Sequence, residues 1–192
     1  ASHNPPEYNG LKISREKALP VGYDSGLKEL EAMIENQEVD PVGKNKKGNI
    51  LEHDLKDEYI EFQKSYLPDL SDLDLAVDVS NGMVAILTDA VFGDQPHYLY
   101  NELDGTFPNH EANPLLAENR EDLKELLLEK GSDIGLIFDG DGDRVMFLDE
   151  EGNFIAPDLI IALLAEYYIN QDKGRDILYD IRTSWSVKEH IE

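Results

Sequence analysis

The chain has 192 residues, of which 41% are apolar, so it is long enough for one or two globular domains with a proper core. Its formal net charge is −24, from 41 acidic and 17 basic residues, which opposes nucleic-acid binding because that depends on Lys and Arg facing phosphates. Since the chain has no cysteine, no signal peptide and no apolar run of membrane-spanning length, we expect a soluble, cytoplasmic protein without disulfides or thiolate chemistry.

The chain begins with a polar loop over residues 1–14 that contains two adjacent prolines and ends in a short strand at residues 11–13. A stiff, exposed loop that carries Ser2, His3 and a nearby Lys12 is suited to nucleophilic chemistry. The residues alone do not establish this, and an ordinary polar loop is the simpler interpretation of one serine beside one histidine.

An amphipathic helix is predicted over residues 25–36, because Leu27, Leu30 and Ile34 fall on one face. Ser25 or Asp24 is suited to cap its start. Residues 37–53 contain proline, glycines and a basic run, which indicates an exposed linker without a ligand. A second helix is expected to begin near residue 54.

Apolar runs and helical patterns then alternate, which predicts an α/β fold of mixed, mostly parallel sheets with helices on both faces. The expected strands and helices, in chain order, are a strand at 73–79, a helix at 83–92, a strand at 97–101, a helix capped by Asn119 and ending at 130, and strands at 134–138 and 145–148. Residues 154–192 start the pattern again with a strand at 154, a helix at 157–170, a strand at 176–181 and a helix from Ser184.

Residues 139–144 read DGDGDR and lie between two apolar strands. Alternate aspartates in extended chain point to the same side, and the glycines leave room for an ion. Three carboxylates held this close repel one another strongly without a cation, and oxygen ligands favour Mg²⁺ before Ca²⁺ or Mn²⁺. Loops at the carboxyl ends of strands carry the functional groups of such folds, so we predict a divalent-metal site of Asp139, Asp141 and Asp143.

Two other interpretations of this loop are possible. An EF-hand would place Glu150 at its twelfth position, but it needs glycine where this chain has Arg144, and flanking helices where it has strands. An acidic hairpin turn would also contain Asp and Gly, although the strict alternation is too ordered for a random turn.

Two separated motifs resemble those of the α-D-phosphohexomutases. Residues 1–12, ASHNPPEYNGLK, resemble the phosphoserine loop of that family, in its phosphomannomutase/phosphoglucomutase branch, and residues 139–144 resemble its metal loop. Three further stretches match as well, namely DVSNG at 78–82, DGTFPNH at 104–110 and DIRTS at 180–184.

The resemblance implies repeated phosphohexomutase-type domains. Residues 1–49 would be the end of domain one with the phosphoserine loop, 50–153 domain two with the metal loop, and 154–192 the opening part of domain three. We therefore expect a fragment of a longer chain, inactive by itself, whose site is completed by missing domains of the same polypeptide. The missing fourth domain would supply the basic groups that attract a phosphosugar to this acidic chain.

The resemblance also implies a mechanism, in which an intramolecular phosphotransferase interconverts hexose 1-phosphate and hexose 6-phosphate, of mannose, glucose or both. Phosphorylated Ser2 would donate its phosphate to the substrate, and a hexose 1,6-bisphosphate would turn over and return the other phosphate to Ser2. One Mg²⁺, held by the three aspartates and Ser2, would offset the charge of the transferring group. The alternatives are a phosphoglucosamine mutase, or a non-catalytic domain that binds a divalent cation.

Four further residues receive roles from the resemblance, each with a simpler alternative. Lys12 is the candidate general base, or else a surface lysine. Arg144 is expected to contact substrate or phosphoserine, or else the neighbouring aspartates. His3 would orient the substrate or relay protons, or else be a hydrogen-bonding neighbour of the site, and Arg182 would contact the sugar phosphate or else pair with Asp180.

Overall fold

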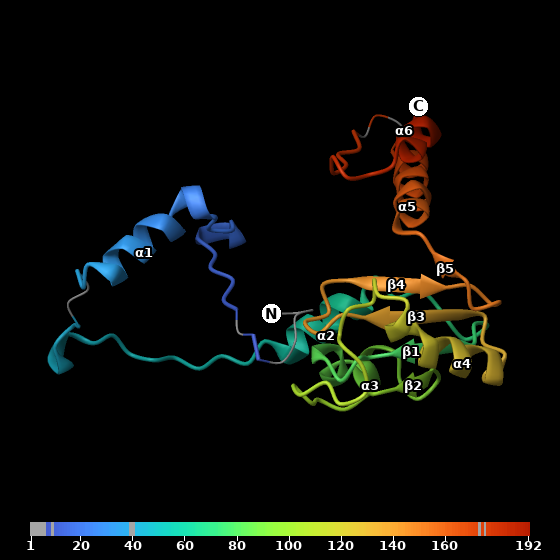
Figure 1. The fold of residues 1–192 in the computed structure, drawn as a ribbon, viewed down its shortest axis with the longest axis horizontal. Coiled ribbons are helices and arrows are strands. Elements are labelled where there is room, and N and C mark those ends of the chain that lie inside the picture. The colour runs from blue at the N-terminus through green and yellow to red at the C-terminus, as the bar shows by residue number, and fades with distance from the viewer. Residues whose placement is uncertain (1–6, 9, 39–40, 173, 175) are drawn as a thin grey trace.

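The computed structural model describes residues 7–8, 10–38, 41–172, 174 and 176–192. One five-stranded sheet lies at its centre, in the order β2-β1-β3-β4-β5 (Figure 1). The strands are β1 (Leu75–Asp78), β2 (His97–Leu99), β3 (Ile134–Phe138), β4 (Val145–Leu148) and β5 (Phe154–Ile155). β1 is parallel to β2 and β3, whereas the β3–β4 and β4–β5 pairs are antiparallel. The predicted mixed α/β sheet is confirmed, with parallel and antiparallel pairs in equal number.

Helical segments cover both faces of this sheet. The α-helices are α1 (Leu27–Glu35), α2 (Lys56–Lys64), α3 (Thr88–Val91), α4 (Glu121–Lys130), α5 (Pro157–Gln171) and α6 (Trp185–Ile191). The 3₁₀ turns are η1 (Glu16–Ala18), η2 (Tyr23–Ser25), η3 (Lys44–Lys46), η4 (Met83–Ile86) and η5 (Glu118–Arg120). No helix of the described residues is both long and apolar enough to span a bilayer.

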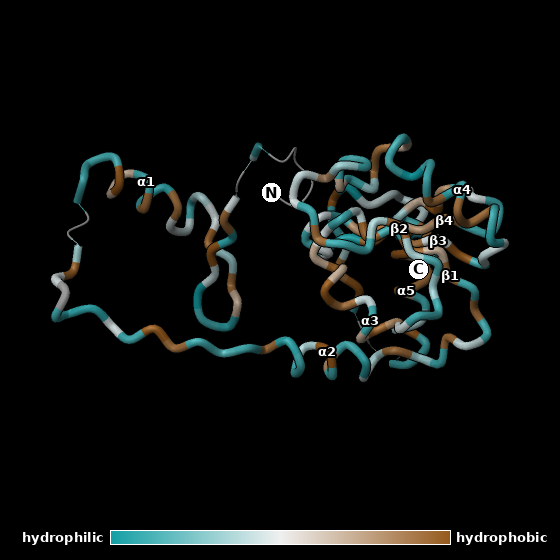
Figure 2. The backbone as a smooth tube through the Cα atoms, turned by 90° about the horizontal axis from the view of Figure 1, so that it is seen from below, coloured by the Kyte–Doolittle hydropathy of each residue, from teal (hydrophilic) through white to brown (hydrophobic). Residues whose placement is uncertain are grey.

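The core lies in two layers, one on each side of the sheet. On one face Leu123 and Leu127 of α4 pack against Ala76, Ile137 and Leu148. The second cluster joins the other face of β1 to η4 and consists of Leu75, Val77, Val79 and Val84. Figure 2 shows hydrophobic stretches in the sheet, and others along α1 and near α3. Because side chains alternate along β1, that strand contributes to both layers and is buried throughout.

Several predicted elements differ from those observed. The strand expected at residues 11–13 is not formed, and the nearest pairing is a single bridge between Ser14 and Pro20. No strand forms at 176–181 either, where Leu178 and Ile181 are almost fully exposed. Both segments have strand-like composition but no neighbouring strand to bond, and an isolated strand gains neither a ladder nor a core.

The helix starts also differ in detail. The helix predicted at 83–92 is divided at Leu87 into η4 and α3, and Met83 N at its start donates to Gly140 O of the DGDGDR loop. Asn119 lies within η5 and its amide donates to Asn113 O at 2.9 Å, so it does not cap α4. Neither Ser25 nor Asp24 caps α1, whose N-cap is Gly26. Ser184 does cap α6, accepting from Ser186 N.

Candidate active site

The three aspartates of the DGDGDR loop converge at the carboxyl end of β3. One oxygen from each of Asp139, Asp141 and Asp143 lies within 4.8 Å of the others. The loop is a hairpin between β3 and β4, closed by Gly142 N donating to Asp139 O at 3.1 Å. Gly142 has φ of 72°, and a Cβ there would meet Val84 Cγ2 at 2.6 Å, so the turn needs glycine at this position.

This geometry excludes one of the three interpretations of the loop. The flanking elements are strands, which excludes an EF-hand, since that needs helices on both sides. The backbone is the acidic hairpin turn that we considered, and its carboxylates nevertheless gather as a cation ligand set requires. A hairpin turn and a metal site are therefore compatible descriptions of the same residues.

Asp139 is the buried member of the cluster, with no exposed surface. Its Oδ1 accepts from Arg144 N at 3.1 Å, whereas Oδ2 has no hydrogen-bond partner among the described residues. Arg144 Nε lies 3.8 Å from Oδ2. Burial raises the pKa of Asp139 above its ordinary value, more than the Arg144 backbone hydrogen bond lowers it. A buried carboxylate oxygen without a donor is one that a cation would satisfy.

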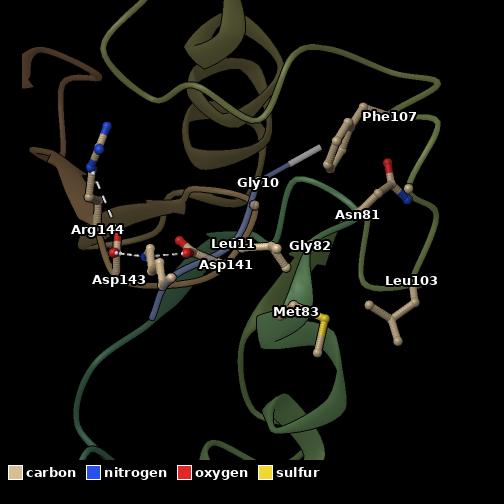
Figure 3. Close-up of a pocket in the computed structure, with 13 residues that line it drawn as sticks. Gly10, Leu11, Asn81, Gly82, Met83, Leu103, Phe107, Asp141, Asp143 and Arg144 are labelled. Atoms are coloured by element: carbon tan, nitrogen blue, oxygen red, sulfur yellow. Dashed lines mark hydrogen bonds and ion pairs between the residues drawn. The ribbon is translucent and has the colours of Figure 1, made fainter. Parts of the chain in front are cut away.

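Lys12 reaches this cluster from the amino-terminal segment. Its Nζ donates to Asp141 Oδ2 at 2.7 Å and to Asp143 Oδ2 at 2.9 Å, the two labelled carboxylates with dashed contacts in Figure 3. These hydrogen bonds raise the pKa of Lys12 and lower that of Asp143. The side chain of Lys12 is 73% exposed, so solvent weakens both ion pairs. The Lys12 ammonium thus neutralises the same two carboxylates that a bound metal cation would neutralise.

Arg144 lies at the other side of the loop. Its Nε is 3.7 Å from Asp143 Oδ1 and 3.8 Å from Asp139 Oδ2, and the side chain is half-exposed. In Figure 3 its guanidinium group extends away from the aspartates. Arg144 therefore contacts the neighbouring aspartates, which was the simpler of its two predicted roles. Its terminal nitrogens are directed away from the loop.

A cleft of about 850 Å³ opens beside the aspartates. Its polar wall includes Lys12, Asp141, Asp143 and Arg144. Sequence reasoning did not assign the residues of the remaining wall, which are Gly10, Leu11, Asn81, Gly82, Met83, Leu103, Gly105, Phe107 and Gly140. Several of these residues belong to the stretches 78–82 and 104–110, which match the family. Both stretches follow strands, β1 and β2, and that position was the signal that could have placed them at the site.

Three predicted site residues remain, namely Ser2, His3 and Arg182. Ser2 and His3 lie outside the described residues. Arg182 pairs with Asp180, its Nε donating to Oδ1 at 2.8 Å, and it does not line the cleft. The roles predicted for all three stay predictions.

The segment after β1 packs closely against the metal loop. A Cβ on Gly82 would lie 2.8 Å from Gly140 O and 3.2 Å from Asp139 O, both of them backbone atoms. Met83 N donates to Gly140 O at 2.9 Å. The metal loop is therefore supported by the neighbouring strand end as well as by its own hairpin.

The chain is similar to known proteins over nearly all of its residues. The family model for phosphoglucomutase/phosphomannomutase alpha/beta/alpha domain II matches residues 57–152. The bounds of the three domains that we predicted stay a prediction. A phosphomannomutase from Salmonella montevideo is 37% identical over 198 residues, covering 98% of this chain and 43% of that protein. The phosphomannomutase of Escherichia coli strain K12 is 36% identical over 201 residues, covering 100% of this chain and 44% of that protein.

Solved structures give the same result for the fold. A phosphoglucomutase/phosphomannomutase family protein from Burkholderia thailandensis superposes with a TM-score of 0.82 at 30% identity, covering 99% of this chain and 41% of that one. A putative phosphomannomutase from Thermus thermophilus has a TM-score of 0.69 at 24% identity, covering 90% and 40%, and shares the fold. The chain thus spans less than half the length of these relatives. With the domain II model matched over half of its residues, the chain belongs to the phosphoglucomutase/phosphomannomutase family.

Proposed function

We propose that the protein containing this chain is a phosphohexomutase that interconverts the 1-phosphate and 6-phosphate of a hexose, mannose or glucose. The observation that carries the proposal is the contact between Lys12 and two aspartates more than a hundred residues later. Lys12 closes the motif that resembles a phosphoserine loop, and Asp141 belongs to the motif that resembles a metal loop. The two motifs thus contribute to one site, as a phosphoryl transfer between serine and sugar requires.

The residues present fit a divalent cation. Asp139 Oδ2 is buried without a hydrogen-bond donor among the described residues, and a lysine ammonium already occupies the space between Asp141 and Asp143. Carboxylate oxygens of this kind suit Mg²⁺. Asp139, Asp141 and Asp143, with an oxygen of Ser2, would hold the ion. Mg²⁺ in that position supplies positive charge to the phosphoryl oxygens during transfer.

The chain's own residues would carry out the transfer in two half-reactions. A substrate hydroxyl attacks the phosphorus on Ser2, a new P–O bond forms to the sugar, and the bond to the serine oxygen breaks. The hydroxyl proton passes to a base, for which Lys12 is the candidate. After the bisphosphate turns over, Ser2 takes the other phosphate and the reaction runs in reverse.

The positions of Lys12 and Arg144 constrain these steps. The hydrogen bonds to the two carboxylates raise the pKa of Lys12 and favour its ammonium form. To accept a proton, Lys12 must lose these contacts and also have its pKa lowered, as a neighbouring cation would do. Arg144 has donors directed away from the aspartates and is suited to bind a phosphate or sugar oxygen.

Intact-mass analysis of freshly purified full-length protein tests the proposal. We expect a phosphate adduct that disappears in Ser2→Ala and persists in Ser14→Ala, a control serine of the same segment. Assays with mannose 1-phosphate, glucose 1-phosphate and glucosamine 1-phosphate as single substrates then separate the two hexose specificities from a phosphoglucosamine mutase. Absence of both adduct and activity in folded protein would leave a non-catalytic cation-binding domain as the function.

A further inference from the structure

We propose that Ser80 and the buried Asp78–His110 pair are positioning residues for the Asp139 carboxylate. They are not among the residues that line the cleft, and Ser80 acts on the backbone that carries Asp139. The inference rests on the proposed cation site and adds to it a group of residues that the phosphoryl-transfer scheme does not use.

Ser80 is the direct link to the metal loop. It is 1% exposed, and its Oγ donates to Phe138 O at 2.7 Å. That carbonyl belongs to the peptide unit that joins Phe138 to Asp139, so the hydrogen bond fixes the plane from which the Asp139 side chain departs. Ser80 has φ of 52°, in the left-handed region that non-glycine residues rarely adopt. Because this backbone conformation is energetically unfavourable for a non-glycine residue, it persists only where surrounding contacts hold it.

Asp78 holds Ser80 in that conformation. Its side chain is completely buried, and Oδ1 accepts from Ser80 N at 2.8 Å. Oδ2 faces His110 Nε2 at 3.0 Å, and the His110 side chain is only 8% exposed. A buried carboxylate is tolerated when it is paired and hydrogen-bonded, so removal of either partner is costly.

The two partners of His110 favour its imidazolium form. Nε2 faces the Asp78 carboxylate and Nδ1 faces Glu111 O at 2.8 Å, so an acceptor lies opposite each ring nitrogen. Burial alone would lower the pKa of His110, but Asp78, Glu111 O and Asp122 raise it above its ordinary value. Tyr100, whose hydroxyl bonds Asp122, packs edge-on against the ring. The groups facing His110 from β1, α4 and its own loop therefore all favour the charged form.

The same network connects both loops that surround the metal loop. Asn109 Nδ2 donates to Asn81 Oδ1 at 2.8 Å, next to His110 and Ser80. Phe107, in the same loop as His110, lines the cleft. Since ligand sets work within about 0.5 Å of their productive geometry, a shift of the Phe138 carbonyl would misplace the Asp139 oxygen.

Ser132 provides a matched control at the opposite end of the same strands. It is also 1% exposed, and its Oγ donates to Asp74 Oδ1 at 2.8 Å, just before β3 and β1 begin. Ser80→Ala and Ser132→Ala each remove one buried hydroxyl that joins the same two strands. They differ in their distance from the aspartates.

The test is a Mn²⁺ titration of full-length protein, followed by electron paramagnetic resonance of the free ion, with thermal unfolding of each variant. We expect Ser80→Ala to bind Mn²⁺ roughly tenfold more weakly, the size typical of residues that orient ligands, and Ser132→Ala to bind like wild type. Both should show a similar fall in Tm. His110→Gln should weaken Mn²⁺ binding in the same direction.

Two outcomes would overturn the inference. The first is wild-type affinity in Ser80→Ala, or an equal loss in Ser132→Ala, while wild-type protein binds Mn²⁺ as proposed. The second is a ¹⁵N spectrum in which His110 has one unprotonated ring nitrogen at neutral pH. If folded wild-type protein does not bind Mn²⁺ at all, the proposed cation site is overturned as well. That result concerns wild type alone, so it is distinguished from the two outcomes above.

Discussion

The two parts of the chain that meet at the candidate site are built very differently. In the sheet, all four residues of β1 are buried, and Asp139 follows β3 into the core. In the amino-terminal segment that carries Lys12, α1 has no buried residue, and Ile34 is 62% exposed. Figure 1 shows α1 lying apart from the sheet. The aspartate half of the site is preorganised by a core, whereas the Lys12 half is held by two exposed ion pairs.

The largest expected effect comes from a core substitution in the sheet half. Leu127 is completely buried between α4 and β3, so Leu127→Ala should lower the free energy of unfolding by about 2–5 kcal/mol. Leu30→Ala, in a helix residue that is 40% exposed, should change it by no more than about 0.5 kcal/mol. Urea unfolding followed by circular dichroism measures both. Similar losses would mean that α1 packs as firmly as α4, contrary to the comparison.

A substitution at the edge of the cleft should have the next largest effect. Gly82→Ala would place a Cβ 2.8 Å from Gly140 O, and backbone cannot give way as a side chain tip can. We expect a loss of about 1–3 kcal/mol together with weaker Mn²⁺ binding. Gly105→Ala is the control, because Gly105 lines the same cleft with nothing within 4 Å of its added Cβ. Urea unfolding and Mn²⁺ titration measure both variants. If Gly82→Ala behaves like Gly105→Ala in both measurements, the close packing of Gly82 against the loop is contradicted.

The sheet half was also the part that could be predicted from sequence. The apolar runs at 134–138 and 145–148 match β3 and β4 residue for residue, because every residue of both strands is at least partly buried and the apolar signal is continuous. The convergence of Asp139, Asp141 and Asp143 was predictable for the same reason, since two well-marked strands enclose only six residues. Gly131 ends α4 in the left-handed conformation, as a glycine after a leucine-rich helix indicates.

The failures concentrate where no core supports the chain or where contacts are long-range. Residues 11–13 and 176–181 have strand composition, but a strand needs a partner that local pattern does not reveal. Ser80 and His110 lie 30 residues apart and are joined through Asp78, so nothing in their spacing marked them as a unit. The apolar wall of the cleft was missed for the same reason.

A smaller, pH-dependent effect should come from His110. The folded pKa of His110 is raised above its ordinary value of 6.5, so its contribution to stability is full below pH 6.5 and is lost as pH rises through the folded pKa. The stability of wild type relative to His110→Gln should therefore be greater at acidic than at alkaline pH, by roughly 1 kcal/mol. Urea unfolding on both sides of that window measures the difference.

His190→Gln is the control for that measurement, because His190 pairs with Glu166 at 3.1 Å with both side chains about half exposed. Exposed pairs of this kind contribute little, so its stability difference should hardly change with pH. A difference for His110→Gln that is constant or grows with pH would contradict a protonated histidine in the Asp78 pair.

The smallest effect on stability, and the sharpest test of the comparison, is expected for Lys12→Ala. Unfolding of the sheet should not change, because Lys12 is 73% exposed and removes no core contact. Hydrogen exchange should instead quicken in residues 10–21, whose amides include Arg15 N and Val21 N, both bonded within the segment. About 1 M NaCl, which shortens the Debye length to about 3 Å, should have the same effect on wild type. Lys28→Ala, a lysine exposed on α1, should leave the exchange unchanged. If protection survives both the substitution and the salt, contacts other than the ion pairs hold the segment, and the Lys12 half is as preorganised as the aspartates.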